Sequence, residues 1–110
     1  MKVALTYSGA VAPATEGEAA VYTPTGGQCF TLNALDVVYG VNVDFDLELS
    51  LYHGTRQVVP ISGVIKGGTG HLPVKAEWTW TSDESIRVHY KNTHASNTYS
   101  FTVILQGELE

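Results

Sequence analysis

An eleven-residue alternation of apolar and polar side chains, from Val43 to His53, most constrains how this chain can fold. A β-strand places successive side chains on opposite faces, so a period of two predicts a strand with one buried face. A helix with 3.6 residues per turn would scatter the same apolar residues around its whole circumference. The apolar positions are Val43, Phe45, Leu47, Leu49 and Leu51, and between them lie Asp44, Asp46, Glu48, Ser50 and Tyr52.

Shorter segments with the same pattern occur along most of the chain, and no segment longer than ten residues has helical periodicity. We expect strands over 28–39, with a β-bulge near Ala34 where the alternation changes phase, and over 56–61, 74–81, 85–91 and 97–107. Residues 40–42 and 53–55 are expected as tight connections, and 62–73 as a mobile loop with a short strand at 64–66. Seven or eight strands at this spacing predict an all-β, single-domain antiparallel β-sandwich.

The first 20 residues differ from the rest, because small residues and chain breakers dominate them. Residues 2–7 alternate and predict a short strand. The segment Ser8–Ala20 contains Gly9, Pro13 and Gly17, which predicts an extended arm. We therefore expect an N-terminal arm over residues 1–20 and a sandwich domain over residues 21–110.

Composition excludes several classes of protein. Charged residues make up 15% and apolar residues 44% of the 110 residues, which predicts one ordered domain rather than a disordered chain. The single cysteine, Cys29, rules out an intramolecular disulfide and a cysteine-based zinc site. A net charge of −5 without a cluster of lysines or arginines argues against nucleic-acid binding. No apolar run is long enough for a membrane span or a signal peptide, so we expect no membrane partner and synthesis in the cytoplasm.

Three carboxylates, Asp44, Asp46 and Glu48, share one face of the expected strand. They could bind Ca²⁺ if a loop supplied further oxygen ligands, and the alternative is a solvated strand face. A basic stripe on another expected strand would complement them, by pairing either within one subunit or between subunits. The basic stripe is Arg87, His89 and Lys91.

Trp78 and Trp80 share one face of an expected strand. Such a pair fills a core, anchors an interface between subunits, or forms a platform on which a sugar ring stacks, with Tyr52 as a further platform residue. The polar residues that alternate with the tryptophans, Glu77 and Thr79, favour the inner face for the indoles.

No motif typical of catalysis or of cofactor binding is present. The segment Gly67–Gly70 lacks the Gly-Lys-Ser/Thr ending of a phosphate-binding loop, and no Gly-x-Ser-x-Gly occurs. We therefore expect no catalytic residue, no cofactor and no metal site. The histidines have no metal-ligand spacing; they are His53, His71, His89 and His94.

Residues 22–107 resemble small jelly-roll proteins of tailed-phage virions, which include capsid decoration or cement proteins, head fibres and tail-associated domains. The stretches that carry the resemblance are VYTPTGGQCFTLNALDVV, FDLELSLYHG, DESIRVHYKN and NTYSFTVILQGEL. They contain a turn and a Gly-x-x-Phe that opens a strand, a long alternating strand, Asp-x-x-Ile-x-Val, an Asn-rich loop and an aromatic closing strand.

This resemblance implies a jelly-roll-like sandwich and a non-catalytic structural or assembly role in a virion. It implies a homo-oligomer, as trimers or larger rings, seated on a capsid or other virion protein, with the N-terminal arm contacting a neighbour. The expected location is the virion, assembled in the host cytoplasm. The alternative function is a carbohydrate-binding β-sandwich module with exposed aromatic residues, located in the cytoplasm or outside the cell.

Overall fold

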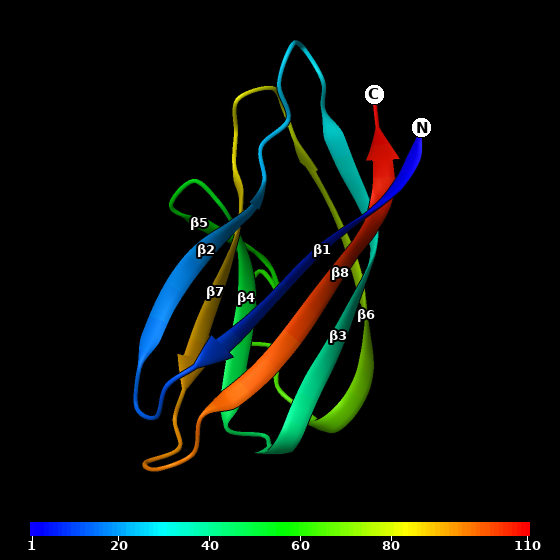
Figure 1. The fold of residues 1–110 in the computed structure, drawn as a ribbon. Coiled ribbons are helices and arrows are strands. Elements are labelled where there is room, and N and C mark those ends of the chain that lie inside the picture. Colours follow the sequence, from blue (N-terminus) through cyan, green and yellow to red (C-terminus); the bar gives the residue numbers. More distant parts are fainter.

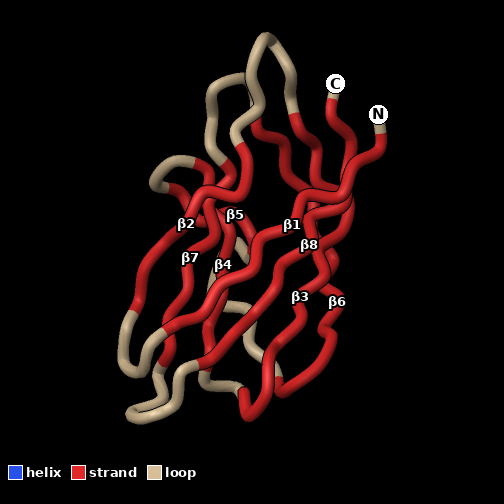
Figure 2. The backbone as a smooth tube through the Cα atoms, in the orientation of Figure 1, coloured by secondary structure: helices blue, strands red, loops and turns tan.

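Every regular element of the chain is a β-strand, as the period-two patterns predict (Figures 1 and 2). The computed structural model describes all residues, 1–110. None of its elements is a helix with the length and apolarity of a membrane span. The strands are β1 (Lys2–Val11), β2 (Glu16–Tyr22), β3 (Phe30–Asp44), β4 (Leu47–His53), β5 (Arg56–Val59), β6 (Gly68–Trp80), β7 (Ile86–Asn92) and β8 (Tyr99–Leu109).

The strands form two antiparallel four-stranded sheets that face each other. One sheet has the order β1-β8-β3-β6 and is called the β1 sheet; the other has the order β2-β7-β4-β5 and is called the β2 sheet. Apart from the β4–β5 hairpin, each connection crosses from one sheet to the other, which gives the strand order of a jelly roll. The two chain ends lie close together at one end of the sandwich (Figure 1), where the Leu109 N–H donates to the Met1 carbonyl. The predicted all-β sandwich is confirmed.

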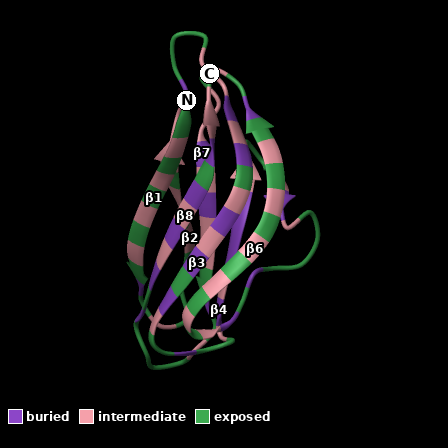
Figure 3. Cartoon of the chain, turned by 90° about the vertical axis from the view of Figure 1, so that its right-hand side faces the viewer, coloured by how far each residue is buried: buried purple, intermediate pink, exposed green.

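The core lies between the inner faces of the two sheets. Twenty buried apolar side chains fill it, and the buried and exposed positions alternate along strands such as β3 (Figure 3). Trp80 is completely buried, and its ring centroid lies 6.3 Å from that of Phe30 on the neighbouring strand.

The alternating segment that was expected as one strand is divided between the two sheets. β3 continues through residues 40–42 to Asp44, and β4 begins at Leu47, so the expected single strand and the expected connection at 40–42 are both corrected. Phe45 lies between the strands with a φ of 60° and is 60% exposed. The alternation survives this crossover because Val43 and Leu47 face the same core from opposite sheets.

Residues 1–20 do not form an arm outside the domain, as the chain breakers suggested. They form β1 and most of β2, and β1 pairs with β8 without a break, from Lys2 opposite Glu108 to Val11 opposite Tyr99. Backbone pairing with β8 compensates for the weak strand propensity of the small residues in β1.

Other local expectations have mixed outcomes. The register of β3 shifts between Leu32 and Ala34, which confirms the bulge, and a turn at Gly54 and Thr55 joins β4 to β5. The expected loop is shorter than predicted, because β6 begins at Gly68. The expected short strand at 64–66 is reduced to a bridge between Ile65 and Leu49.

Candidate functional site

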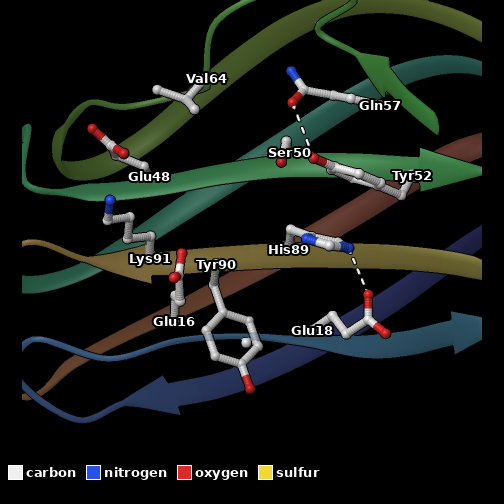
Figure 4. Close-up of a pocket in the computed structure, with 11 residues that line it drawn as sticks. Glu16, Glu18, Glu48, Ser50, Tyr52, Gln57, Val64, His89, Tyr90 and Lys91 are labelled. Carbon is white, nitrogen blue, oxygen red and sulfur yellow. Dashed lines mark hydrogen bonds and ion pairs between the residues drawn. The ribbon is translucent and has the colours of Figure 1, made fainter. Parts of the chain in front are cut away.

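The outer face of the β2 sheet carries an open groove of about 390 Å³ (Figure 4). β2, β7 and β4 each contribute side chains that point away from the core, and Gln57 and Val64 border the groove beyond β4. Apart from two tyrosines, the charged and polar side chains that β2, β7 and β4 contribute to its lining are Glu16, Glu18, Glu48, Ser50, His89 and Lys91.

Acidic and basic side chains alternate across this face. β7 lies between β2 and β4, so Lys91 stands opposite Glu16 on one side and Glu48 on the other. On the same face, Arg87 Nη1 lies 3.4 Å from a carboxylate oxygen of Glu18. Exposed pairs of this kind contribute at most about 1 kcal/mol each, so they specify strand register more than they stabilise the fold.

The sequence predicted the basic stripe correctly but identified only part of its acidic complement. β4 and β7 are neighbours, and Glu48 lies in register with Lys91, as an arrangement within one subunit requires. The other acidic side chains come from β2, where Glu16 and Glu18 flank Gly17 and so lie on the same face of the strand. This alternation is visible in the sequence, but the glycine between the two glutamates favours an extended arm over a strand.

One cross-strand row contains a serine, a histidine and a carboxylate, which are Ser50, His89 and Glu18. His89 Nε2 lies 2.6 Å from Glu18 Oε2, although no hydrogen bond satisfies this nitrogen. In Figure 4 no hydrogen bond joins Ser50 to His89. A serine nucleophile needs a hydrogen bond to its base, so this row lacks the contact on which acyl transfer depends.

Tyr52 lies in the same groove, but its ring is already engaged. It stacks on the imidazole of His89, with the ring centroids 3.6 Å apart and the planes inclined by 14°. Its hydroxyl donates to Gln57 Oε1 at 3.4 Å. Of the residues expected as a platform, Tyr52 alone faces this groove, and His89 covers one side of its ring.

The two tryptophans lie on the inner face of β6. Trp80 is buried in the core and donates from Nε1 to the Tyr52 carbonyl at 3.2 Å. Trp78 is half-buried beside the core and carries the Arg56 guanidinium 5.1 Å from its ring centroid. Trp80 therefore takes the core role that the pattern left open, and the tryptophans do not join Tyr52 in one surface.

Trp78 belongs to a hydrogen-bonded chain at one end of the sandwich. Its Nε1 donates to His53 Nδ1 at 3.0 Å, so the ring proton of a neutral His53 is on Nε2, which donates to Glu84. The other oxygen of Glu84 accepts from the backbone N–H and the hydroxyl of Thr81. These hydrogen bonds, from Thr81 first and then from His53, lower the pKa of Glu84 to about 2.

The carboxylates that were weighed as calcium ligands are not brought together. Asp46 Oδ2 accepts from the Tyr99 hydroxyl at 2.6 Å, and Oδ1 accepts from the backbone N–H of Asp44 at 3.1 Å. Glu48 lines the groove instead. No group of three or more histidine, cysteine or acidic side chains is arranged to hold a metal ion.

Comparisons with known proteins give a likeness of fold. The sequence matches no protein-family model and no curated protein. A chain of the acid-stable capsid structure of Helicobacter pylori bacteriophage KHP30 superposes with a TM-score of 0.56 and 12% identity, over 98% of this chain and 94% of that chain. The crystal structure of FlhE superposes with a TM-score of 0.51 and 16% identity, over 97% of each chain. At these identities the likeness establishes a shared fold and does not transfer a function.

Proposed function

We propose that the protein is a non-catalytic structural component of a tailed-phage virion, of the capsid-decoration or head- or tail-associated type, and that it works as a homo-oligomer. The observation that carries this proposal is the whole-length likeness to a chain of a phage capsid structure, which covers 98% of this chain and 94% of the other. Almost the whole of each chain takes part in the superposition, so the likeness extends over both sheets of the sandwich.

The polar clusters of the molecule support a structural role. The serine of the Ser50–His89–Glu18 row is not hydrogen-bonded to the histidine, and Glu84 and Asp46 each have both carboxylate oxygens bonded by the protein itself. A catalytic carboxylate or nucleophile has to be available to its substrate. We propose on this basis that the protein is not an enzyme.

The proposed partners are further copies of this chain and a capsid or other virion protein. The net charge of −5 disfavours nucleic acid, and the proposed location is the virion, assembled in the host cytoplasm.

The test is saturable binding to virus particles. Fluorescently labelled protein is sedimented with virions purified from the phage that encodes it, after the native copies have been stripped, and light scattering gives its oligomeric state in solution. We expect an oligomer that binds at a fixed ratio to the major capsid protein, while an unrelated acidic β-sandwich stays in the supernatant. A monomer at tens of micromolar that does not sediment with the particles would overturn the proposal.

A carbohydrate-binding module is the second candidate, and the groove on the β2 sheet favours it. Tyr52 offers an aromatic ring there, and Gln57, Glu18 and Glu48 offer hydrogen-bonding groups around it. Calorimetric titration with a panel of glycans tests this candidate. Binding that is lost in Tyr52→Ala and kept in Trp78→Phe would support it, and the absence of binding to every glycan would exclude it for that panel.

A further inference from the structure

The two sheets expose four edge strands, and three of them carry features that prevent pairing with another chain. β6 contains Pro73, which has no N–H to donate, and Gly70 with a φ of 119°. β5 has only four residues and is followed by Pro60. β2 has a register shift between Ala20 and Tyr22 and carries two glutamates on its outer face. Proline, irregular backbone, short strands and charge are the usual protections of a sheet edge.

β1, the fourth edge, has none of these protections over most of its length. It is ten residues long, contains no proline, keeps one register with β8 throughout and has a single charge, at Lys2. In Figure 3, β1 lies along one side of the molecule with no strand of its sheet beyond it. A long, regular and nearly uncharged edge is a template for a further strand.

The hydrogen bonds at the start of β1 show which backbone groups are free. Met1 and Leu109 exchange both of their backbone hydrogen bonds, so in this antiparallel pair the odd-numbered residues of β1 face β8. The even-numbered residues therefore point their N–H and C=O groups away from β8, and no backbone hydrogen bond outside the sheets involves any of them. The residues with free backbone groups are Lys2, Ala4, Thr6, Ser8 and Ala10.

The side chains of β1 suit a neighbouring strand on both faces. On the outer face, the residues from Ala4 to Ala10 are small and uncharged, so they would not obstruct an adjacent strand. On the inner face, Val3, Leu5 and Tyr7 pack against the core but are only partly buried. A strand added beside β1 would cover these apolar side chains and satisfy the free backbone groups together.

We infer that β1 pairs with β1 of a second copy of this chain, antiparallel and about a two-fold axis at Thr6, which joins the two β1 sheets into one continuous sheet. The inference rests on the homo-oligomer of the proposed function and specifies its contact. It gives a dimer in place of the trimers or larger rings that the sequence resemblance implies, because a two-fold contact is isologous and closes on two copies.

The sequence of β1 is complementary to itself in this register. Thr6 lies opposite Thr6 of the partner subunit, and Leu5 lies opposite the partner's Tyr7, so apolar side chains meet on the inner face. The two copies of Lys2 lie at opposite ends of the contact, about 27 Å apart at the rise of a strand. Parallel pairing would place these charges side by side, so charge favours the antiparallel arrangement.

The first experiment measures the mass of the protein in solution by light scattering after gel filtration. We expect the wild type at twice the chain mass of 11.9 kDa and Thr6→Pro at half the wild-type value, with an unchanged circular dichroism spectrum. Proline at this position removes an outward N–H and no bond to β8. The matched control is Ile104→Lys, on the same outer face but on the interior strand β8, and it should remain dimeric. A wild-type trimer, or a dimer that survives Thr6→Pro, would overturn the contact while leaving the homo-oligomer intact.

A cross-linking experiment keeps the test decisive if the proline variant does not fold. In a Cys29→Ser background, Thr6→Cys places two thiols opposite each other at the axis, where paired Cα atoms are about 5.5 Å apart, within the range that a disulfide spans. Ser8→Cys places its thiols about 13 Å apart in the same register. We expect mild oxidation to cross-link Thr6→Cys and not Ser8→Cys. The reverse pattern, equal cross-linking of both, or a wild-type monomer would overturn the inference, whereas the particle-binding assay reports on the virion role separately.

Discussion

A hydrogen-bonded carboxylate lies at each end of β4, Glu84 at one end and Asp46 at the other, and the two carboxylates have different partners. At the C-terminal end, His53 donates to Glu84, which also accepts two hydrogen bonds from Thr81 in the β6–β7 connection. At the N-terminal end, Asp46 accepts from Tyr99 at the start of β8 and from its own neighbour Asp44. Each carboxylate therefore links β4 to a connection or strand that is distant in sequence.

The difference between the ends lies in what surrounds the carboxylate. The Glu84 cluster contains the imidazole of His53 and lies beside half-buried Trp78. At the other end, the backbone carbonyl of Asp46 accepts hydrogen bonds from the N–H and the hydroxyl of Thr93. Thr93 directly follows Asn92, which is buried. Desolvation raises the pKa of Asp46, but the hydrogen bonds from Tyr99 and Asp44 outweigh it, and the pKa is lowered.

The lowered pKa values of Glu84 and Asp46 have the same physical cause, which is hydrogen bonds made within the fold. Both oxygens of Glu84 and both oxygens of Asp46 accept hydrogen bonds from groups that the fold itself brings to them. Perturbed pKa values also occur in structural networks of hydrogen bonds. At both ends of β4, the hydrogen bonds that link the strand to distant segments explain the lowered values. Substitutions at each end distinguish how much the two ends contribute to stability.

Asn92→Ala should have the largest effect, at the Asp46 end. The Asn92 amide donates to the carbonyls of Val11 and Asn97 and accepts from the His94 N–H, and the residue is 1% exposed. Its removal leaves buried backbone groups without partners, so the free energy of unfolding should fall by about 3 kcal/mol. Urea denaturation measures this, with exposed Asn33→Ala as the control, expected to change stability by no more than about 0.5 kcal/mol. A loss similar to that of the control would contradict the assigned role.

Trp78→Phe should have a smaller effect, at the His53 end. The variant keeps an aromatic ring beside the core but loses the hydrogen bond from Nε1 to His53 Nδ1. We expect the free energy of unfolding to fall by about 1 kcal/mol. Nitrogen NMR of His53 provides an independent readout: Glu84 should keep the ring proton on Nε2 in both proteins, whereas the Nδ1 chemical shift should change when the Trp78 donor is lost. An unchanged Nδ1 chemical shift would show that Trp78 does not donate to the histidine.

Glu84→Gln should reduce the acid sensitivity of the protein. The pKa of Glu84 is lowered in the folded state to about 2 from an ordinary value of 4.5, so the ionised side chain favours the folded state above pH 4.5. That contribution is lost as the pH falls from 4.5 towards 2. Melting curves between pH 7 and pH 2 should show that the variant is less stable than wild type at neutral pH and that the difference narrows in acid. Parallel curves for the two proteins would disprove the linkage.

Asp46→Asn should change the pH dependence of stability in the same direction as Glu84→Gln, and by the smallest amount of the four substitutions. The folded pKa is again lowered, so the stabilisation exists above the ordinary pKa of 3.8 and is lost as the pH falls below it. Because desolvation opposes the hydrogen bonds, the melting temperature should depend on this side chain less than on Glu84. The same series of melting curves tests this order, and a larger pH-dependent change in Asp46→Asn than in Glu84→Gln would reverse the comparison.

Local pattern predicted much of the fold. The alternation in β4 and β8, the bulge near Ala34 and the turn at Gly54 all depend on residues close in sequence, and the structure has each of them. β1 escaped prediction as a full strand because alanine, serine and glycine have weak strand propensity, and only pairing with β8, about 100 residues away, stabilises it.

The candidate groove was predictable only in part, for a related reason. The alternation of the sequence predicts the basic side chains of β7 and their acidic neighbour Glu48 on β4. It does not predict the two acidic neighbours on β2, Glu16 and Glu18. The roles of Trp78 and Trp80 stayed open because residues at positions i and i+2 share a face whether that face is core or surface.

The sequence by itself determined that this chain is an all-β sandwich, because a side-chain period of two is a local property of each strand. Only the tertiary structure decided which strands are neighbours, which side of each is buried and which edge remains free. Strand pairing joins residues that are distant in sequence through backbone groups that every residue carries, so residue types alone do not specify it. The Val43–His53 alternation shows both parts: its period predicted β-structure correctly, and only the structure showed that it serves two sheets.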